Sequence, residues 1–147
     1  MRTPTEPIGL QVINTAQLVS SALDGALTSA GGSLGMWRVL VAASGKDHRH
    51  GAQPMLPETL GISAAMLSDE VRRLEVTGLV VRKPDAHVSH GPSLEVTEAG
   101  RALFHSLLRV VIAFDTRLRT GLGADDIDVF SSTLTRLRSN AASRERS

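Results

Sequence analysis

Two adjacent arginines, Arg72 and Arg73, follow two adjacent carboxylates, Asp69 and Glu70, in the segment SAAMLSDEVRRLE. Guanidinium groups are fixed planar cations that suit phosphates and guanine edges, so both arginines are candidates for nucleic-acid contacts. A carboxylate near a phosphate weakens such binding, although at a base edge it can accept a hydrogen bond from cytosine. Whether the segment binds nucleic acid therefore depends on where each of the four charges points.

The segment has the periodicity of one helix, capped by Ser63 and ended by Gly78. Leu67, Val71 and Leu74 form the apolar stripe that we expect to face the core. A second stripe, toward the end of the helix that would enter a major groove, is expected to be exposed. It contains Ala64, Ala65, Ser68 and Arg72.

The two carboxylates lie outside that second stripe to different degrees. Glu70 lies about 200° from Ser68 around the helix, so we interpret it as a solvated charge able to pair with Arg73. Asp69 is next to the stripe, and three interpretations stay open: pairing with Arg72 or Arg73, readout of a base, or weakening of nucleic-acid binding. We hypothesise that Asp69 suppresses non-specific binding.

The elements before this helix are expected to be helical too. Apolar residues recur at steps of three or four over residues 8–30, a helix longer than a small monomer can cover, which indicates a partner. They are Val12, Ala16, Val19, Leu23 and Ala26. Ser33 is expected to cap a second helix, LGMWRVLVAAS, and a short third helix is expected over MLPETLGIS.

After Gly78 the period changes to that of strands. LVVRK (79–83) and SLEVT (93–97) predict a β-hairpin. Thr97 is expected to cap a long helix over 98–120. A last helix over 124–140 carries Asp125 and Asp126 at its start and Arg136 and Arg138 at its end, which suits the helix dipole.

This order predicts a mainly α fold of the α+β type: a winged helix-turn-helix with N- and C-terminal dimerisation helices. We expect an N-terminal arm over 1–7, one domain over 8–140 and a frayed tail over 141–147. Within the domain, the winged helix-turn-helix spans 33–97 and the dimerisation helices span 8–30 and 98–140.

Composition limits the function without naming it. The 147 residues carry a net charge of only +1, so any basic surface must be local. Of the 16 basic residues only Lys46 and Lys83 are lysines. The absence of cysteine excludes disulfides, thiolate zinc sites and cysteine nucleophiles. No apolar run approaches the roughly 20 residues needed to span a bilayer, and we expect a soluble, cytoplasmic protein with no membrane partner.

The stretch LGIS…VRRLEVTGLVVRK…LEVTEAGRAL, within residues 60–103, resembles the MarR family of bacterial transcriptional regulators. The family pattern there is a helix ending Arg-Leu-Glu-x-x-Gly-Leu-Val, then a hairpin closing with Leu-Thr-x-x-Gly-Arg. The resemblance covers residues 8–138. It implies a homodimeric repressor that binds a pseudopalindromic operator in double-stranded DNA and is released by a small aromatic or anionic effector.

The sequence departs from the family pattern in three places. A basic residue is usual where Asp69 stands. The Asp-x-Arg of the wing is replaced by Val88, Ser89 and His90, so His90 would replace the wing arginine. The Leu-Ala before the turn is replaced by Leu56-Pro57, and a proline shortens or delays that helix.

Arg72 and Arg73 are the main candidates for DNA contact, and Arg82 and Lys83 could hold phosphates at the start of the wing. For each cation the plainer interpretation, a solvated surface charge, stays open. The full set of DNA-binding candidates is Ser63, Ala64, Ala65, Ser68, Asp69, Arg72, Arg73, Arg82, Lys83 and His90.

An effector site is implied by the resemblance, near the second helix and a polar stripe on the first. Its candidates are Asn14, Gln17, Met36, Trp37 and Arg38. Trp37 is either a core residue or a platform for the effector, and Arg38 is either a surface or DNA-backbone cation or a clamp for a carboxylate.

Other chemistry has weaker support. His48 and His50 share a loop, and His87, His90 and His105 lie elsewhere, but no defined third ligand completes a metal site. Neither a nucleophile elbow nor a phosphate-binding glycine loop is present, so we expect no enzyme, no cofactor and no metal. The alternative function is a dimeric winged-helix module that binds a protein or sequesters a ligand, with weak or no DNA binding.

Overall fold

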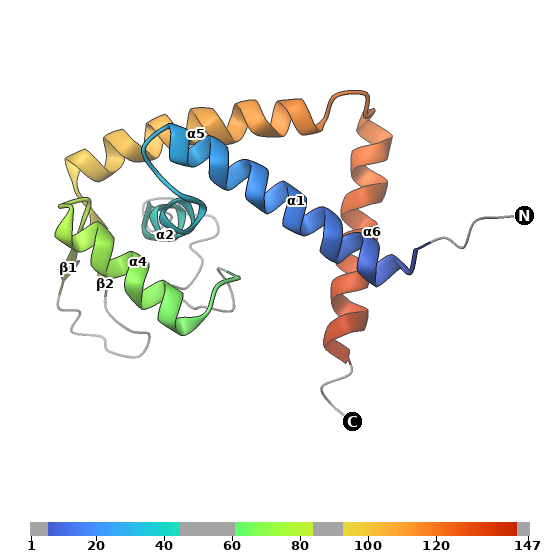
Figure 1. Ribbon diagram of the computed structural model, residues 1–147, viewed down its shortest axis with the longest axis horizontal. Helices are drawn as coiled ribbons and strands as arrows, with labels where there is room; N and C mark the ends of the chain where they lie inside the picture. Colours follow the sequence, from blue (N-terminus) through green and yellow to red (C-terminus); the bar gives the residue numbers. More distant parts are fainter. Residues whose placement is uncertain (1–5, 45–60, 84–92, 144–147) are drawn as a thin grey trace, which may run out of the picture. The chain divides into compact units, whose positions relative to one another are not determined.

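A computed structural model of the chain describes residues 6–44, 61–83 and 93–143. The chain forms two compact units, residues 1–112 and 113–147. In the described ranges the elements are α1 (Ile8–Ser29), α2 (Leu34–Ser44), α4 (Ala64–Val76), β1 (Val80–Lys83), β2 (Ser93–Val96), α5 (Glu98–Leu118) and α6 (Ala124–Ala142) (Figure 1). The short helix expected over MLPETLGIS falls mainly on residues 45–60, outside the described part. None of the described helices is long and apolar enough to cross a membrane.

Side-chain caps set the starts of three helices, as the sequence predicted. The Ser33 hydroxyl accepts the Met36 N–H at 3.1 Å at the start of α2. At α4, the Ser63 hydroxyl accepts the Met66 N–H at 3.2 Å. Each cap satisfies a backbone donor that the first helical turn leaves without a partner, so helices begin where such a side chain stands.

Thr97 joins three elements through both its backbone and its side chain. Its hydroxyl accepts the Gly100 N–H at 3.1 Å, which caps α5, and donates to the Gly78 carbonyl at 2.6 Å. Its N–H donates to the Leu79 carbonyl at 3.0 Å. Gly78 itself has φ +74°, a conformation that favours glycine, and this turn ends α4 immediately before β1.

The predicted hairpin is confirmed as a two-stranded antiparallel sheet. Val80 pairs with Val96, and Arg82 pairs with Leu94. Val80, Leu94 and Val96 are buried, whereas Arg82 is exposed. These four residues share one face of the hairpin, which completes the core and leaves Arg82 exposed at its end. Val81 and Glu95, which are paired on the other face, are both exposed.

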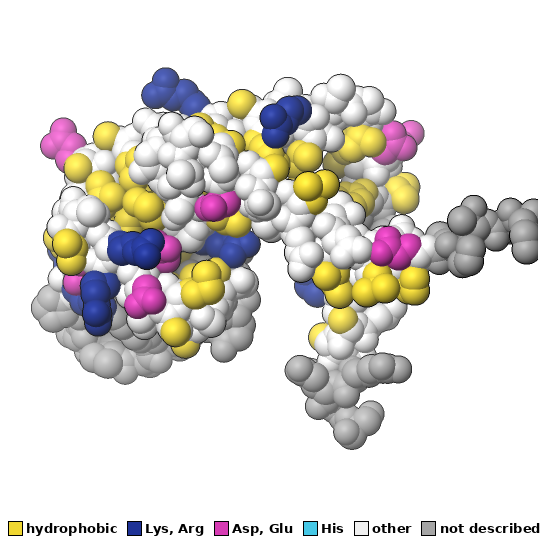
Figure 2. Space-filling model, viewed as in Figure 1, with side chains coloured by type: hydrophobic (Ala, Val, Ile, Leu, Met, Phe, Trp, Pro, Cys, Tyr) yellow, Lys and Arg dark blue, Asp and Glu magenta, His cyan; other side chains and the backbone are white. Residues whose placement is uncertain are grey.

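The first half of α1 is exposed throughout. Leu18 is 72% exposed and Ile8 60% exposed, and residues 8–18 contain no buried side chain. Figure 2 shows one face of the molecule, on which hydrophobic side chains lie at the surface among charged ones. The second half of α1 packs instead on the core through Leu27. The apolar stripe predicted on this helix therefore packs against the core at the C-terminal end of α1 only.

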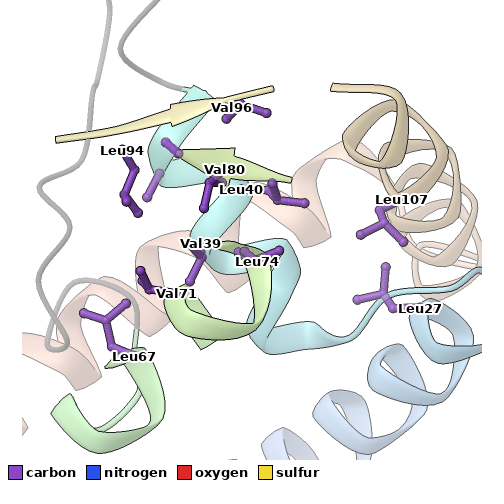
Figure 3. Packing of buried hydrophobic residues seen from close by; sticks show 12 residues of the cluster. Leu27, Val39, Leu40, Leu67, Val71, Leu74, Val80, Leu94, Val96 and Leu107 are labelled. Carbon is purple, nitrogen blue, oxygen red and sulfur yellow. The ribbon is translucent and has the colours of Figure 1, made fainter. Parts of the chain in front are cut away.

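The core of the first unit draws on all its elements. Its fully buried side chains include Leu27 of α1, Leu40 of α2, Leu74 of α4 and Leu107 of α5 (Figure 3). Burying one such side chain contributes about 1.5–3 kcal/mol. The stripe predicted on α4 is confirmed, because its three members Leu67, Val71 and Leu74 are all buried. This burial fixes which face of α4 is left for other contacts.

The second unit contains the end of α5 and all of α6. An Asp126 carboxylate oxygen accepts the Gly123 N–H at 2.8 Å, which holds the start of α6. The helix runs to Ala142, beyond the expected end, so Arg136 and Arg138 are not in its last turn and the expected dipole complement there is wrong. No residue of α6 is buried within the chain.

Candidate nucleic-acid interface

The exposed face of α4 carries the stripe that the sequence singled out. Packing of α4 on α2 and β1 covers the leucine and valine stripe and leaves the opposite side open. All four members of this stripe are exposed, namely Ala64, Ala65, Ser68 and Arg72. The neighbouring Ser63 and Asp69 are exposed as well. Their order along the helix places small side chains at its start and a guanidinium two turns later.

Arg72 is exposed, and it forms no ion pair with any residue in the described ranges. The same holds for Asp69, which is also exposed. The structure thus shows no pairing of Asp69 with Arg72 or Arg73, which was one of the three interpretations. Among the residues that the structure describes, neither Arg72 nor the adjacent Asp69 thus has an ion-pair partner.

Glu70 is not the solvated charge that the helical projection predicted. Its side chain is only 14% exposed, and its Oε2 atom is buried without a hydrogen-bond partner among the described residues. A Cβ placed on Gly35, in the first turn of α2, would stand 2.8 Å from its Oε1 atom. The carboxylate therefore occupies the space that the missing Gly35 side chain leaves, at the positive end of the α2 dipole.

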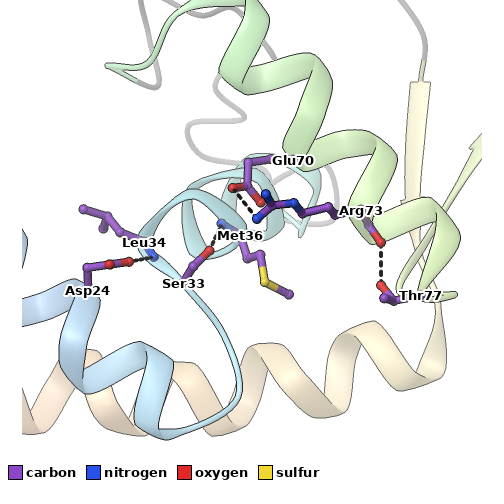
Figure 4. Close-up of polar contacts among 7 residues, drawn as sticks. All are labelled: Asp24, Ser33, Leu34, Met36, Glu70, Arg73 and Thr77. Atoms are coloured by element: carbon purple, nitrogen blue, oxygen red, sulfur yellow. Dashed lines mark hydrogen bonds and ion pairs between the residues drawn. The ribbon is translucent and has the colours of Figure 1, made fainter.

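The predicted pairing of Glu70 with Arg73 is present but long. Glu70 Oε1 lies 3.9 Å from Arg73 Nη1, and the Arg73 side chain is 72% exposed (Figure 4). An exposed ion pair of this length contributes little stability. The Arg73 guanidinium therefore stays near the surface, at a distance from the Glu70 carboxylate at which the two charges attract only weakly.

The two cations at the start of the wing are both paired. Arg82 Nε lies 2.6 Å from Glu75 Oε1, which joins β1 to the last turn of α4. The Lys83 ammonium pairs with the Glu95 carboxylate across the hairpin. The sequence did not indicate Glu75 and Glu95 as partners of these candidate cations. The signal for Glu95 is the hairpin register, in which Val81 is opposite Glu95, so that Lys83 lies diagonally across from it.

Several predicted residues lie outside the described part of the chain. They include the proposed wing residue His90 and the loop histidines His48 and His50. In the described ranges, no group of histidines and carboxylates is arranged to hold a metal ion. His105 instead lies edge-on to the Phe104 ring, with ring centroids 5.6 Å apart.

Trp37 stacks on a ring of α5. Its centroid is 5.3 Å from that of Phe104, with 6° between the ring planes, and both rings pack against the buried cluster. Met36 packs against the same cluster. These contacts favour the core interpretation of Trp37 over that of an open platform.

Among the remaining effector candidates, Arg38 and Asn14 form hydrogen bonds with different neighbours. Arg38 Nη1 donates to the Gly61 carbonyl at 3.4 Å, at the turn before α4. Asn14 Nδ2 donates to the Glu6 carboxylate at 2.7 Å, and Gln17 is exposed on α1. No hydrogen bond joins the candidates of α1 to those of α2 within the part of the chain described.

The arrangement of these elements matches known structures. A MarR family transcriptional regulator from Rhodococcus sp. RHA1 is 24% identical, with 93% of this chain and 96% of that chain covered and a TM-score of 0.74. The chain has the MarR fold. The chain is also similar to CouR from Rhodococcus jostii RHA1 bound to p-coumaroyl-CoA, at 24% identity, with 93% of this chain and 95% of that chain covered and a TM-score of 0.75.

A third structure with the MarR fold is a MarR family protein of Mycobacterium tuberculosis in complex with salicylic acid. It is 22% identical, with 91% of this chain and 98% of that chain covered and a TM-score of 0.66. Comparisons with protein-family models and with curated protein sequences found no match. The MarR fold expected from residues 60–103 is thus confirmed by structure.

Proposed function

We propose that the chain is a DNA-binding transcriptional regulator, a homodimeric repressor that a small-molecule effector releases. One observation carries the proposal more than any other. Arg72 is an exposed cation without an ion-pair partner in the described ranges, and it ends a stripe of small side chains on the helix that the MarR fold presents outward. Such a surface fits the major groove of a duplex.

The dimensions of α4 support this fit. A major groove about 12 Å wide admits one helix, and residues near the N-terminus of a reading helix approach the base edges. Ala64, Ala65 and Ser68 are small, so the backbone of α4 can come close to the bases. Arg72 then reaches a phosphate or a guanine edge, and Arg73 stays near the adjacent backbone.

Exposed apolar side chains on α1 and α6 support the homodimer. Leu18 of α1 is 72% exposed, and Val129 and Phe130 of α6 are 66% and 60% exposed. Large apolar side chains that stay exposed in the folded chain mark an interaction site. A second copy that covers these helices would hold two α4 helices about 34 Å apart, one helical turn of DNA.

The effector part of the proposal draws on two neighbours with the same fold. One is bound to p-coumaroyl-CoA and the other is in complex with salicylic acid, and both molecules are aromatic and anionic. We extend that chemistry to this chain and keep five residues as candidates for the site. They are Asn14, Gln17, Met36, Trp37 and Arg38.

A second candidate function is a dimeric winged-helix module that binds a protein or a ligand rather than DNA. The ion pairs of Glu70 with Arg73, Glu75 with Arg82 and Glu95 with Lys83 favour it. They neutralise three of the four cations proposed for DNA, and the net charge of +1 offers no general attraction to a polyanion.

A mobility-shift assay separates the two functions. The full chain is titrated onto a duplex from the region upstream of its own gene at low salt, as wild type and as Arg72→Ala. The wild type should shift the duplex, and the variant should bind more weakly, with the slope of log K against log salt reduced by about 2 for a dimer that loses two phosphate contacts.

The matched control is Arg119→Ala, which removes an arginine paired with Asp115 outside the first unit. It should leave the slope close to that of the wild type. A wild-type protein that shifts no duplex at low salt would contradict the regulator and favour the second function. An unchanged slope in Arg72→Ala would remove this residue from the interface.

A further inference from the structure

We propose that Glu75 and Glu95 restrain Arg82 and Lys83 from DNA phosphates, and that these two carboxylates thereby set the affinity and salt dependence of DNA binding. The inference rests on the proposed function, because it assumes that α4 and the hairpin face a duplex. The groups that compete with DNA phosphates are side chains of the protein itself, and no additional ligand is involved.

The pairing of Arg82 with Glu75 is close and well supported. Arg82 Nε and Glu75 Oε1 are 2.6 Å apart, a direct charge-assisted hydrogen bond. Glu75 is in the last turn of α4, where the carbonyl end of the helix dipole disfavours a carboxylate. The guanidinium of Arg82 offsets that unfavourable position, so the helix end itself favours keeping Arg82 on Glu75.

The pairing of Lys83 with Glu95 is more accessible. Their side chains are 58% and 53% exposed, and they come from neighbouring strands of the hairpin. A lysine ammonium is a compact charge on a flexible stem, so Lys83 can leave Glu95 more readily than Arg82 leaves Glu75. We therefore expect Glu95 to restrain its partner less than Glu75 does.

Arg72 differs from the two paired cations, Arg82 and Lys83. It is exposed on α4 and has no ion-pair partner in the described ranges. A phosphate can bind Arg72 at once, whereas it must displace a carboxylate before it gains a full contact with Arg82 or Lys83. Non-specific binding depends almost wholly on phosphate contacts, so such competition lowers affinity for any duplex.

The size of the effect follows from the strength of exposed ion pairs. A free energy of about 0.2–1 kcal/mol per pair corresponds to roughly 1.4-fold to fivefold in affinity per protomer. Two protomers on one duplex would raise that to roughly 2-fold to 25-fold. Each cation that gains a phosphate should also steepen the salt dependence by about 0.9, or about 2 for a dimer.

The experiment compares three isosteric changes in the full chain: Glu75→Gln, Glu95→Gln and, as a control, Glu98→Gln. Glu98 is an exposed carboxylate in the first turn of α5 without an ion pair in the described ranges. All three variants gain the same unit of net charge. Fluorescence anisotropy with a labelled random duplex gives the Kd of each over a series of salt concentrations, and circular dichroism checks that each is folded.

Glu75→Gln and Glu95→Gln should each bind more tightly than Glu98→Gln and show a steeper salt dependence. Equal gains in all three variants would overturn the inference, because net charge alone would explain them. A wild type that binds the duplex, with Glu75→Gln and Glu95→Gln unchanged from it, would overturn the inference and leave the proposed function standing. Failure of the wild type and every variant to bind any duplex at low salt would overturn both.

Discussion

Gly100 is a position at which one added methyl group should destabilise the fold substantially. It lies in the first turn of α5, where a Cβ would stand 2.1 Å from the Leu79 carbonyl oxygen and 2.7 Å from Val96 Cγ1. Real Cβ atoms essentially never come within 3.0 Å of another heavy atom in this way. The oxygen belongs to the backbone and already accepts the Thr97 N–H at 3.0 Å, so no side-chain rotation can relieve the contact.

The size of the effect combines two opposing contributions. Overpacking of a closed site costs about 1–3 kcal/mol, and a clash with backbone belongs at the upper end of that range. Replacing a helical glycine with alanine raises the free energy of unfolding by about 1 kcal/mol through helix propensity. We therefore expect Gly100→Ala to lower the free energy of unfolding by about 2 kcal/mol, and the Tm by about 4–8 °C.

Urea and thermal unfolding followed by circular dichroism would measure this change. The variants must be compared at one protein concentration, because the stability of an associating protein depends on it. Ala102→Gly, at an exposed position of the same helix, calibrates the helix-propensity contribution and should cost about 1 kcal/mol. A Gly100→Ala protein as stable as the wild type would refute the reasoning, since it would show that the Leu79 carbonyl yields without cost.

Two further predictions concern the carboxylates Glu70 and Asp69 of α4. Gly35→Ala should change the free energy of unfolding by less than about 1 kcal/mol, because its Cβ meets the movable Glu70 side chain rather than backbone, and a loss as large as that of Gly100→Ala would contradict this. Asp69→Asn should bind a random duplex up to roughly fivefold more tightly in anisotropy titrations, since it removes a carboxylate near Arg72 that has no ion-pair partner in the described part of the chain. Unchanged or weaker affinity would count against a role for Asp69 in suppressing non-specific binding.

Much of the fold could be predicted because its signals are local. Ser33, Ser63 and Thr97 cap the helices that follow them, and each acts on a backbone N–H only three residues away. The apolar stripe of α4 depends on spacing within one helix. Such features need no knowledge of what packs on them, and a single sequence contains them in full.

The charges of the candidate site could not be predicted in the same way. The Glu70 side chain is only 14% exposed because Gly35, far away in the chain, leaves room for it beside another helix. Arg82 and Lys83 are paired because of how α4 meets β1 and how the two strands register. Helical periodicity predicts on which side of its helix a side chain lies. Which residue of another element it contacts depends on tertiary packing.

The junction at Thr97 has a mechanical consequence. One residue links the turn after α4, the start of β1 and the first turn of α5 through three hydrogen bonds. No long linker separates α5 from the end of α4 at this junction, so a small rotation of one is passed directly to the other. If the proposed function holds, a ligand that tilts α5 only slightly would change the angle at which α4 meets a groove of DNA.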